Sequence, residues 1–130
     1  MGYGDNPTGL IFRATEVYPS LAAGVTVTDG GGAWGLGALS NDIIAAAAVP
    51  NDYVVDAVAV ENISAADDFE LVLYHGAGDV ECARIRFDGA QTAVISCHTP
   101  LIPGGDRLKA KVASATGGRN IDVSVQIRRV

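Results

Sequence analysis

The chain has 130 residues, of which 48% are hydrophobic and 18% charged, and its formal net charge is −6. This length is typical of one domain that buries a core without a metal or a disulfide, and the composition excludes a disordered chain. No apolar run reaches the roughly 18 residues of a membrane span, and the first residues lack the pattern of a secretory signal. We therefore expect one domain, made in the cytoplasm without a signal peptide and with no membrane partner.

Charge is divided unevenly along the chain. Residues 1–80 hold eleven acidic side chains against the single base Arg13, whereas residues 81–130 hold four acids and eight bases. The acidic balance argues against nucleic acid as a partner, because that partner needs a cationic face. The basic C-terminal part indicates either solvated strand faces or a local positive face that meets copies of the chain or an oppositely charged lattice.

The first nine residues are predicted to form a flexible N-terminal arm, because three glycines and a proline interrupt them and they show no periodicity. Such a segment cannot bury enough apolar surface to offset its ordering entropy. If the arm is ordered, a neighbouring subunit or a shell must hold it, with Tyr3 as the anchoring aromatic. The folded domain is expected over residues 10–130.

Short runs with period-two alternation follow the arm and predict strands. The predicted strands are residues 10–13, 15–18, 25–28, 34–39, 54–61, 69–75, 80–87, 92–97, 107–113 and 120–128. Apolar and polar residues alternate most cleanly in the last, from Ile121 to Ile127, which is typical of an antiparallel sheet with one wet face. In 54–61 the alternation places Val58 on the opposite face from Val55. Residues 40–48 leave a helical turn or an extended segment open.

These elements predict an all-β fold, an antiparallel β-sandwich of about eight strands. Helical crossovers are absent from the pattern, which excludes parallel α/β folds. An immunoglobulin sandwich would place a tryptophan between two widely spaced cysteines, but Trp34 precedes both Cys82 and Cys97. A jelly roll with two sheets fits the order better.

The glycine run before Trp34 formally matches a dinucleotide-binding fingerprint, GGGAWG at 30–35. That fingerprint requires a following helix, and a strand-like run follows instead, so we expect a loop whose glycines adopt positive φ. Trp34 itself is expected either to plug the core or a subunit contact, or to stack on a sugar ring at the rim of the sandwich.

Cys82 and Cys97 are predicted to lie on neighbouring strands of one hairpin. If the loop closes between Phe87 and Thr92, Cys82 faces Cys97; if Asp88 and Gly89 form a two-residue turn, Cys82 faces Ile95. The register stays open. We expect free and mostly buried thiols, because nothing marks the chain as exported to an oxidising compartment.

No signature of catalysis, cofactor or metal binding is found in the sequence. His75, Cys82, Cys97 and His98 lack the close pairs typical of structural zinc sites, and no calcium loop is present. A nucleophile elbow and an HExxH helix are also absent. We expect a non-enzymatic protein without cofactors.

Three stretches carry a resemblance to a known family: VYPSLAAGVTVT (17–28) with GAWG (32–35), DAVAVENIS (56–64), and TPLIPGGDRLKAKVAS (99–114) running into GGR (117–119). The chain resembles small jelly-roll structural proteins of tailed-bacteriophage virions. The resemblance implies a capsid decoration or cement protein on the capsid surface of the virion, a homo-oligomer and most simply a trimer, whose partner is the major capsid protein. It carries over no site residues.

The alternative function is a carbohydrate- or receptor-binding module of a phage fibre or tail. A carbohydrate module would present Trp34, Tyr53 or Tyr74 in an exposed, loop-rimmed pocket with acids nearby. A cement protein would instead place its arm and one sheet edge against a shell. In either case the residues predicted to contact a partner are Tyr3, Trp34, Arg128 and Arg129.

Overall fold

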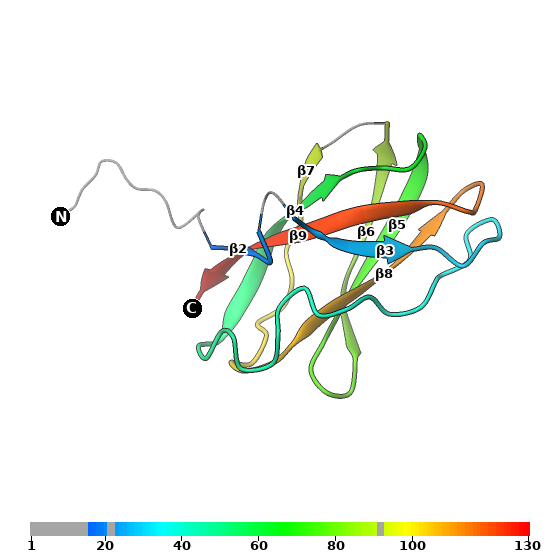
Figure 1. Ribbon diagram of the computed structural model, residues 1–130. Coiled ribbons are helices and arrows are strands. Elements are labelled where there is room, and N and C mark those ends of the chain that lie inside the picture. Colours follow the sequence, from blue (N-terminus) through cyan, green and yellow to red (C-terminus); the bar gives the residue numbers. More distant parts are fainter. Residues whose placement is uncertain (1–15, 21–22, 91–92) are drawn as a thin grey trace, which may run out of the picture.

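The computed structural model describes residues 16–20, 23–90 and 93–130. Within these ranges the chain is all-β, with two antiparallel sheets packed as a sandwich (Figure 1). The strands are β2 (Val17–Tyr18), β3 (Val25–Thr28), β4 (Tyr53–Glu61), β5 (Asp67–His75), β6 (Val80–Gly89), β7 (Ala93–Ser96), β8 (Leu108–Ser114) and β9 (Asn120–Arg129). The predicted arm with Tyr3 and the predicted strand 10–13 lie outside the described residues. Among the residues described, no helix is long and apolar enough to span a membrane.

The strand order is that of a jelly roll, as the sequence predicts. One sheet has the order β3-β9-β4-β7, with β2 also paired to β9, and the other has the order β6-β5-β8. The chain changes sheets between β4 and β5, between β6 and β7, and at each later connection. The segment before β4 bonds to the free edge of β8 and completes the second sheet, so each layer has four strand positions.

The core lies between the two sheets and follows the period-two pattern of the sequence. Ile121, Val123, Val125 and Ile127 of β9 are at most 1% exposed, which confirms the alternation predicted for that strand. They share one continuous cluster with inward-facing side chains of the other sheet, including Phe69, Leu71, Leu73, Leu108 and Val112.

Strand β4 departs from the predicted alternation at one residue. Its register against β9 shifts between Val55 and Ala57, which marks a β-bulge at Asp56. A bulge inserts one unpaired residue and reverses the alternation beyond it. Val55 and Val58 are both fully buried as a result, although the sequence pattern placed them on opposite faces.

The predicted strand 34–39 is wrong, because this segment runs along β8 in a three-to-two register. The N–H groups of Trp34, Gly37, Ser40 and Ile43 donate to the carbonyls of residues 114, 112, 110 and 108. Each two-residue step of β8 thus faces three residues, and regular pairing is impossible. Gly37 is required here because a Cβ would lie 1.8 Å from the carbonyl oxygen of Thr28. Residues 40–48 form neither a helix nor one extended segment: Ile44 makes an isolated bridge to Leu108, and a turn follows in which the Ala48 N–H donates to the Ala45 carbonyl.

The predicted hairpin that joins Cys82 to Cys97 is also wrong. Strand β6 pairs with β5, and β7 pairs with β4 in the other sheet, so neither proposed register exists. Asp88 and Gly89 belong to β6 and form no turn. Gly89 packs so closely on Phe69 that a Cβ would lie 2.7 Å from its ring. Both cysteines are free thiols, as expected.

Candidate ligand-binding site

Trp34 lies in the loop after β3, at the end of the sandwich where β9 begins. Its backbone has a φ of 55°, in the left-handed region that costs a non-glycine residue roughly 1–2 kcal/mol. Hydrogen bonds hold the loop in this shape: Gly30 N–H donates to the Gly35 carbonyl, and Trp34 N–H to the carbonyl of Ser114 at 2.7 Å. The indole stays 38% exposed, so it does not plug the core.

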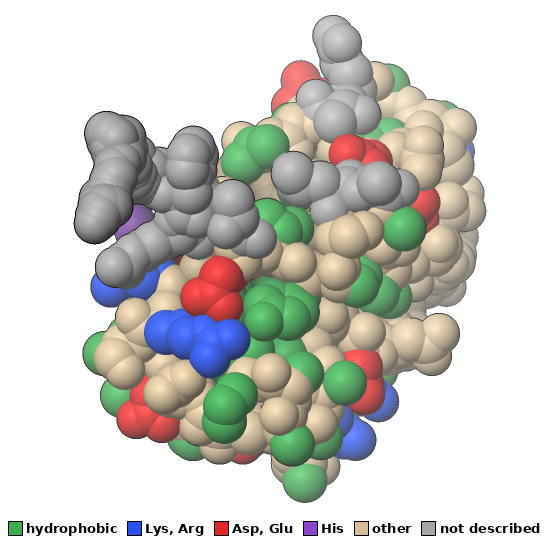
Figure 2. Space-filling model, turned by 60° about the vertical axis from the view of Figure 1, so that its left-hand side comes forward, with side chains coloured by type: hydrophobic (Ala, Val, Ile, Leu, Met, Phe, Trp, Pro, Cys, Tyr) green, Lys and Arg blue, Asp and Glu red, His purple; other side chains and the backbone are tan. Residues whose placement is uncertain are grey.

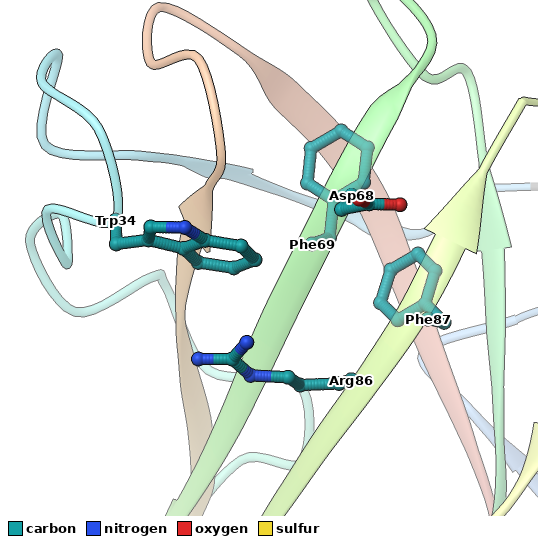
Figure 3. A pocket seen from close by; sticks show the side chains of 5 residues that line it. All are labelled: Trp34, Asp68, Phe69, Arg86 and Phe87. Atoms are coloured by element: carbon teal, nitrogen blue, oxygen red, sulfur yellow. The ribbon is translucent and has the colours of Figure 1, made fainter.

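The Trp34 side chain lines a hollow of about 270 Å³, the Trp34 hollow, together with Asp68, Phe69, Arg86 and Phe87. Figure 3 shows the indole reaching across from its loop toward β5, with the guanidinium of Arg86 below it. The guanidinium carbon lies 4.2 Å from the ring centroid, which is a cation–π contact. Phe69 and Phe87 stack with ring centroids 5.5 Å apart and close the far side.

A buried carboxylate fixes the loops around the hollow. Asp29, 7% exposed, accepts hydrogen bonds from the Ser114 hydroxyl and from the N–H groups of Gly31, Gly118 and Arg119. Ser114 ends β8, and the N–H donors belong to two loops that Figure 1 shows side by side, the one after β3 and the one between β8 and β9. The loops touch at Gly117, whose φ is 93° and whose added Cβ would lie 2.6 Å from the Gly31 carbonyl oxygen.

The same hydrogen bonds set the ionisation of Asp29. Burial by itself would raise the pKa of this carboxyl, but the hydroxyl of Ser114 and the three backbone N–H groups outweigh burial and hold the pKa below its usual value. The carboxylate is therefore ionised at neutral pH and can accept the hydrogen bonds of all four donors. The loop that carries Trp34 is thus held in place before any ligand arrives, which lowers the entropic cost of binding.

The other two aromatic residues predicted for a carbohydrate site, Tyr53 and Tyr74, lie in different environments. The prediction is wrong for Tyr53, which is fully buried in the core and donates its hydroxyl to the carbonyl of Asp106 at 3.1 Å. Tyr74 is half-buried on the outer face of β5, with the ammonium of Lys111 5.3 Å from its ring centroid. Tyr74 and Trp34 therefore both flank the same sheet, but only Trp34 lines the hollow.

Arg128 and Arg129 end β9, whereas the Trp34 loop lies beside the start of that strand, so the structure separates these predicted partner residues. Arg128 pairs with Asp56 at 3.2 Å, and Arg129 pairs with Glu16 at 2.8 Å. Figure 2 brings the C-terminal side of Figure 1 forward and shows basic, acidic and apolar side chains interspersed there. Their role in partner contact stays a prediction, as does that of Tyr3.

The thiols and histidines do not assemble into a reactive site. Burial raises the pKa of Cys82 to about 12 and that of Cys97 to about 11, which disfavours the nucleophilic thiolates. His75 pairs with Asp106 at 2.7 Å. In the described part of the chain, no three histidine, cysteine or acidic side chains are placed to hold a metal ion.

Sequence reasoning found Trp34 but missed the four residues that share its hollow. Asp68, Phe69, Arg86 and Phe87 lie on β5 and β6, and only the strand pairing brings them to the loop after β3. A second hollow of about 350 Å³ lies beside β3 and has no aromatic ring in its lining. It is lined by Thr26, Thr28, Asp29, Ala38, Leu39, Ser40 and Asn41. Of these two hollows in the described part of the chain, the Trp34 hollow is the one that offers aromatic surface.

Comparison with known proteins shows a distant structural likeness. No protein-family model and no curated protein matches the chain. Among solved structures, the chain is similar to a carbohydrate-binding module of lichenase 5A from Cellvibrio mixtus, solved in complex with cellotriose. The two share 13% sequence identity with a TM-score of 0.47, over 90% of this chain and 98% of the other. What this chain binds has to be inferred from its own side chains.

Proposed function

We propose that this domain binds carbohydrate and that a sugar ring packs against Trp34. The observation that carries the proposal is a partly exposed tryptophan that lines a hollow whose other walls supply both apolar and charged groups. The apolar face of a pyranose packs on an aromatic ring, and its hydroxyls need planar polar partners. Arg86 offers donors and Asp68 offers acceptors at the rim.

Two further features support a binding role for Trp34. A bulky residue in the left-handed region is sparsely populated and costly, and such strain gathers at ligand sites. The surrounding loops are held by Asp29, so the indole is presented in a fixed orientation. This arrangement agrees with the alternative function expected from the sequence, in which Trp34 lines an exposed pocket with an acid nearby.

The capsid decoration role, the trimer and the virion location stay predictions from the resemblance. No contact among the described residues favours them over the carbohydrate role. The two roles are also compatible, since a domain on a virion surface can bind sugars.

The test uses the fact that Trp34 is the single tryptophan of the chain. Titration of neutral oligosaccharides of different linkage should change the intrinsic fluorescence of the wild-type protein, because the indole moves out of water. By calorimetry, Trp34→Ala should weaken binding about thirtyfold, the effect of losing a roughly 2 kcal/mol contact. Trp34→Phe should recover part of it.

Leu36→Ala is the matched control. Leu36 lies in the same loop with the same exposure, 37% against 38% for Trp34, but does not line the hollow. The control should bind as the wild type does. The proposal fails if no oligosaccharide, neutral or acidic, binds the wild type, or if Leu36→Ala and Trp34→Ala weaken binding equally.

A further inference from the structure

The outer face of the β6-β5-β8 sheet gathers half of the basic side chains of residues 81–130. The register places Arg86 opposite Glu70, and Arg84 opposite Val72, which in turn faces Lys111. We call this surface the basic face and define it by its outward-facing side chains. In three successive cross-strand rows they are Glu70, Val72, Tyr74, Glu81, Arg84, Arg86, Lys109, Lys111 and Ala113, and the adjoining row of the same outer face carries Asp68 and Asp88.

Cations outnumber carboxylates on the basic face, although Arg84 pairs with Glu81, which is 44% exposed, and Lys109 lies 3.9 Å from Asp42. Glu70 lies between the two arginines, accepts from both, and is only 14% exposed, whereas Arg84 is 43% and Arg86 is 65% exposed. Lys111 has no carboxylate within ion-pair distance among the described residues and lies over Tyr74 instead. Within the three rows of the basic face, four cations outnumber two glutamates, although the chain carries −6 overall and the adjoining row with Asp68 and Asp88 is acidic.

The floor of the basic face is apolar and closed. Val72 is 0% and Ala113 is 1% exposed although both point away from the core. Long stems of arginine and lysine cover such residues while their charged ends stay in water, and here Arg84 and Lys111 lie directly across from Val72. An aromatic residue stands at each end, Trp34 over Arg86 and Tyr74 under Lys111.

The two aromatic positions are separated by a distance that suits an oligomer. Trp34 lies over Arg86, which pairs with Glu70 on β5. Glu70 and Tyr74 are four residues apart on that strand, so the two aromatic positions are separated by about 13 Å along it. A single sugar ring is shorter than this distance. A short oligosaccharide seated on Trp34 would continue over Arg86 and Arg84 toward Lys111 and Tyr74.

We infer that the ligand is an acidic oligosaccharide, whose carboxylate or sulfate groups bind the cations of the basic face. This inference rests on the proposed carbohydrate function and names the class of ligand. Arginine forks bind carboxylate and sulfate oxygens through paired, charge-assisted hydrogen bonds. Glu70, Glu81 and Asp68 lie among the cations and accept from neutral hydroxyls. A glycan with both charged and uncharged groups matches this alternation, whereas a nucleic acid brings a phosphate at every unit.

The experiment compares acidic oligosaccharides with neutral forms of the same chain length. Oligogalacturonate and its methyl ester form one pair, and a sulfated glycan and its desulfated form make the other, so the two pairs separate carboxylate from sulfate. Binding to the full chain is followed by Trp34 fluorescence and calorimetry at low and high salt. The acidic member of at least one pair should bind about tenfold tighter, and this advantage should shrink as salt screens the charges.

Charge-removing variants locate the effect. Lys111→Gln and Arg84→Gln should each lower the affinity for the acidic form by about tenfold, the effect of one charged hydrogen bond, and leave binding of the neutral form unchanged. Arg128→Gln is the matched control, because it removes an exposed guanidinium that pairs with Asp56 on the other sheet. It should change neither affinity.

Three results would overturn the inference. If neutral and acidic members bind equally while Trp34→Ala still weakens binding, the proposed function stands and the acidic ligand is wrong. If a short single-stranded DNA binds more tightly than every glycan, the basic face is a nucleic-acid site. If Arg128→Gln weakens the acidic form as much as Lys111→Gln does, the attraction is a property of net charge and not of the basic face.

Discussion

The two outer faces of the sandwich belong to two different antiparallel sheets, and they differ in charge and in how far their outward-facing residues are buried. On the basic face, arginine and lysine stems bury Val72 and Ala113 and keep an aromatic ring at each end. The other sheet exposes small, polar and acidic side chains, which we call the acidic face. Its members are Thr26, Thr28, Asp56, Ala59, Glu61, Val94, Ser96, Asp122, Gln126 and Arg128.

The difference shows that position in a sheet does not by itself decide burial. Val72 and Val94 both point outward, yet Val72 is 0% and Val94 is 69% exposed. Val72 lies on the central strand of its sheet between two long cationic side chains, whereas Val94 lies on the short edge strand β7. The basic face therefore behaves as a second, thin apolar layer with a charged surface, and the acidic face as ordinary solvated sheet.

The largest expected effect is a difference in stability between variants of two aspartates, Asp29 and Asp122, that each accept hydrogen bonds from neighbouring residues. Asp29→Ala should lower the free energy of unfolding by about 3 kcal/mol or more, because buried donors from Ser114 and Gly118 lose their acceptor. Asp122→Ala, on the acidic face, removes bonds from Thr26 and Asn62 that are open to water, and should cost under about 1 kcal/mol. Urea unfolding measures both. Equal losses would show that Asp29 does not organise the loops.

The second effect compares the two outward-facing valines directly. Val72→Ala should cost about 2 kcal/mol, as in a core, because it leaves a cavity beneath the stems of Arg84 and Lys111. Val94→Ala should stay within about 0.5 kcal/mol, which is usual for a surface substitution. Thermal or urea unfolding checks the pair. If the Val72→Ala variant is as stable as the wild type, Val72 does not form part of an apolar layer beneath the stems of Arg84 and Lys111.

A smaller effect concerns pH. The pKa of Asp29 is lower in the folded protein than in the unfolded chain, so its carboxylate stabilises the fold above its unfolded value of about 3.9. That stabilisation is lost as the pH falls toward the folded pKa. The amide that replaces the carboxyl in the Asp29→Asn variant cannot titrate, so the melting temperature of this variant should fall less steeply below about pH 4. Parallel acid slopes for the variant and the wild type would contradict this.

The smallest effect compares one thiol from each sheet. Cys82 of β6 and Cys97 after β7 both have a pKa raised by burial, to about 12 and about 11. Neither should react quickly with a thiol reagent near neutral pH in the folded protein, and both should react at once in denaturant. Rapid labelling of the Cys97→Ser variant in native buffer would show that the β6 edge opens.

Most strands were predictable because the alternation of apolar and polar residues within each one indicates which side chains are buried. In β9 every second residue from Ile121 to Ile127 is apolar, and the structure buries them all. The bulge at Asp56 was not predictable, since it depends on the pairing of β4 with β9. Nor was the change of sheet after β6. A connection of three residues between β6 and β7 is as compatible with a hairpin as with a crossing to the other sheet. Which of the two forms depends on where Ile85 and Ile95 can pack against the core.

The candidate site was predictable only through its aromatic residue. Trp34 is unique in the chain and follows a glycine run, which indicated an exposed loop. The partners of Trp34 come from strands about 35 to 50 positions away, so no local pattern connects them. A signal for the basic face does exist in the sequence: Arg84 and Arg86, and likewise Lys109 and Lys111, are two residues apart and so share one face of a strand.

The three-to-two register of residues 34–43 also bears on assembly. A segment that bonds to β8 only at every third residue offers no row of groups at strand spacing, so another chain cannot extend the sheet on that side. Within the described residues, the opposite edge is β6, which pairs only with β5. A twofold partner centred on Ile85 would bring Arg84 against the copy's Arg86, and like charges destabilise such pairs. In the β6-β5-β8 sheet one edge is therefore blocked by geometry and the other by charge, which disfavours strand addition at this sheet.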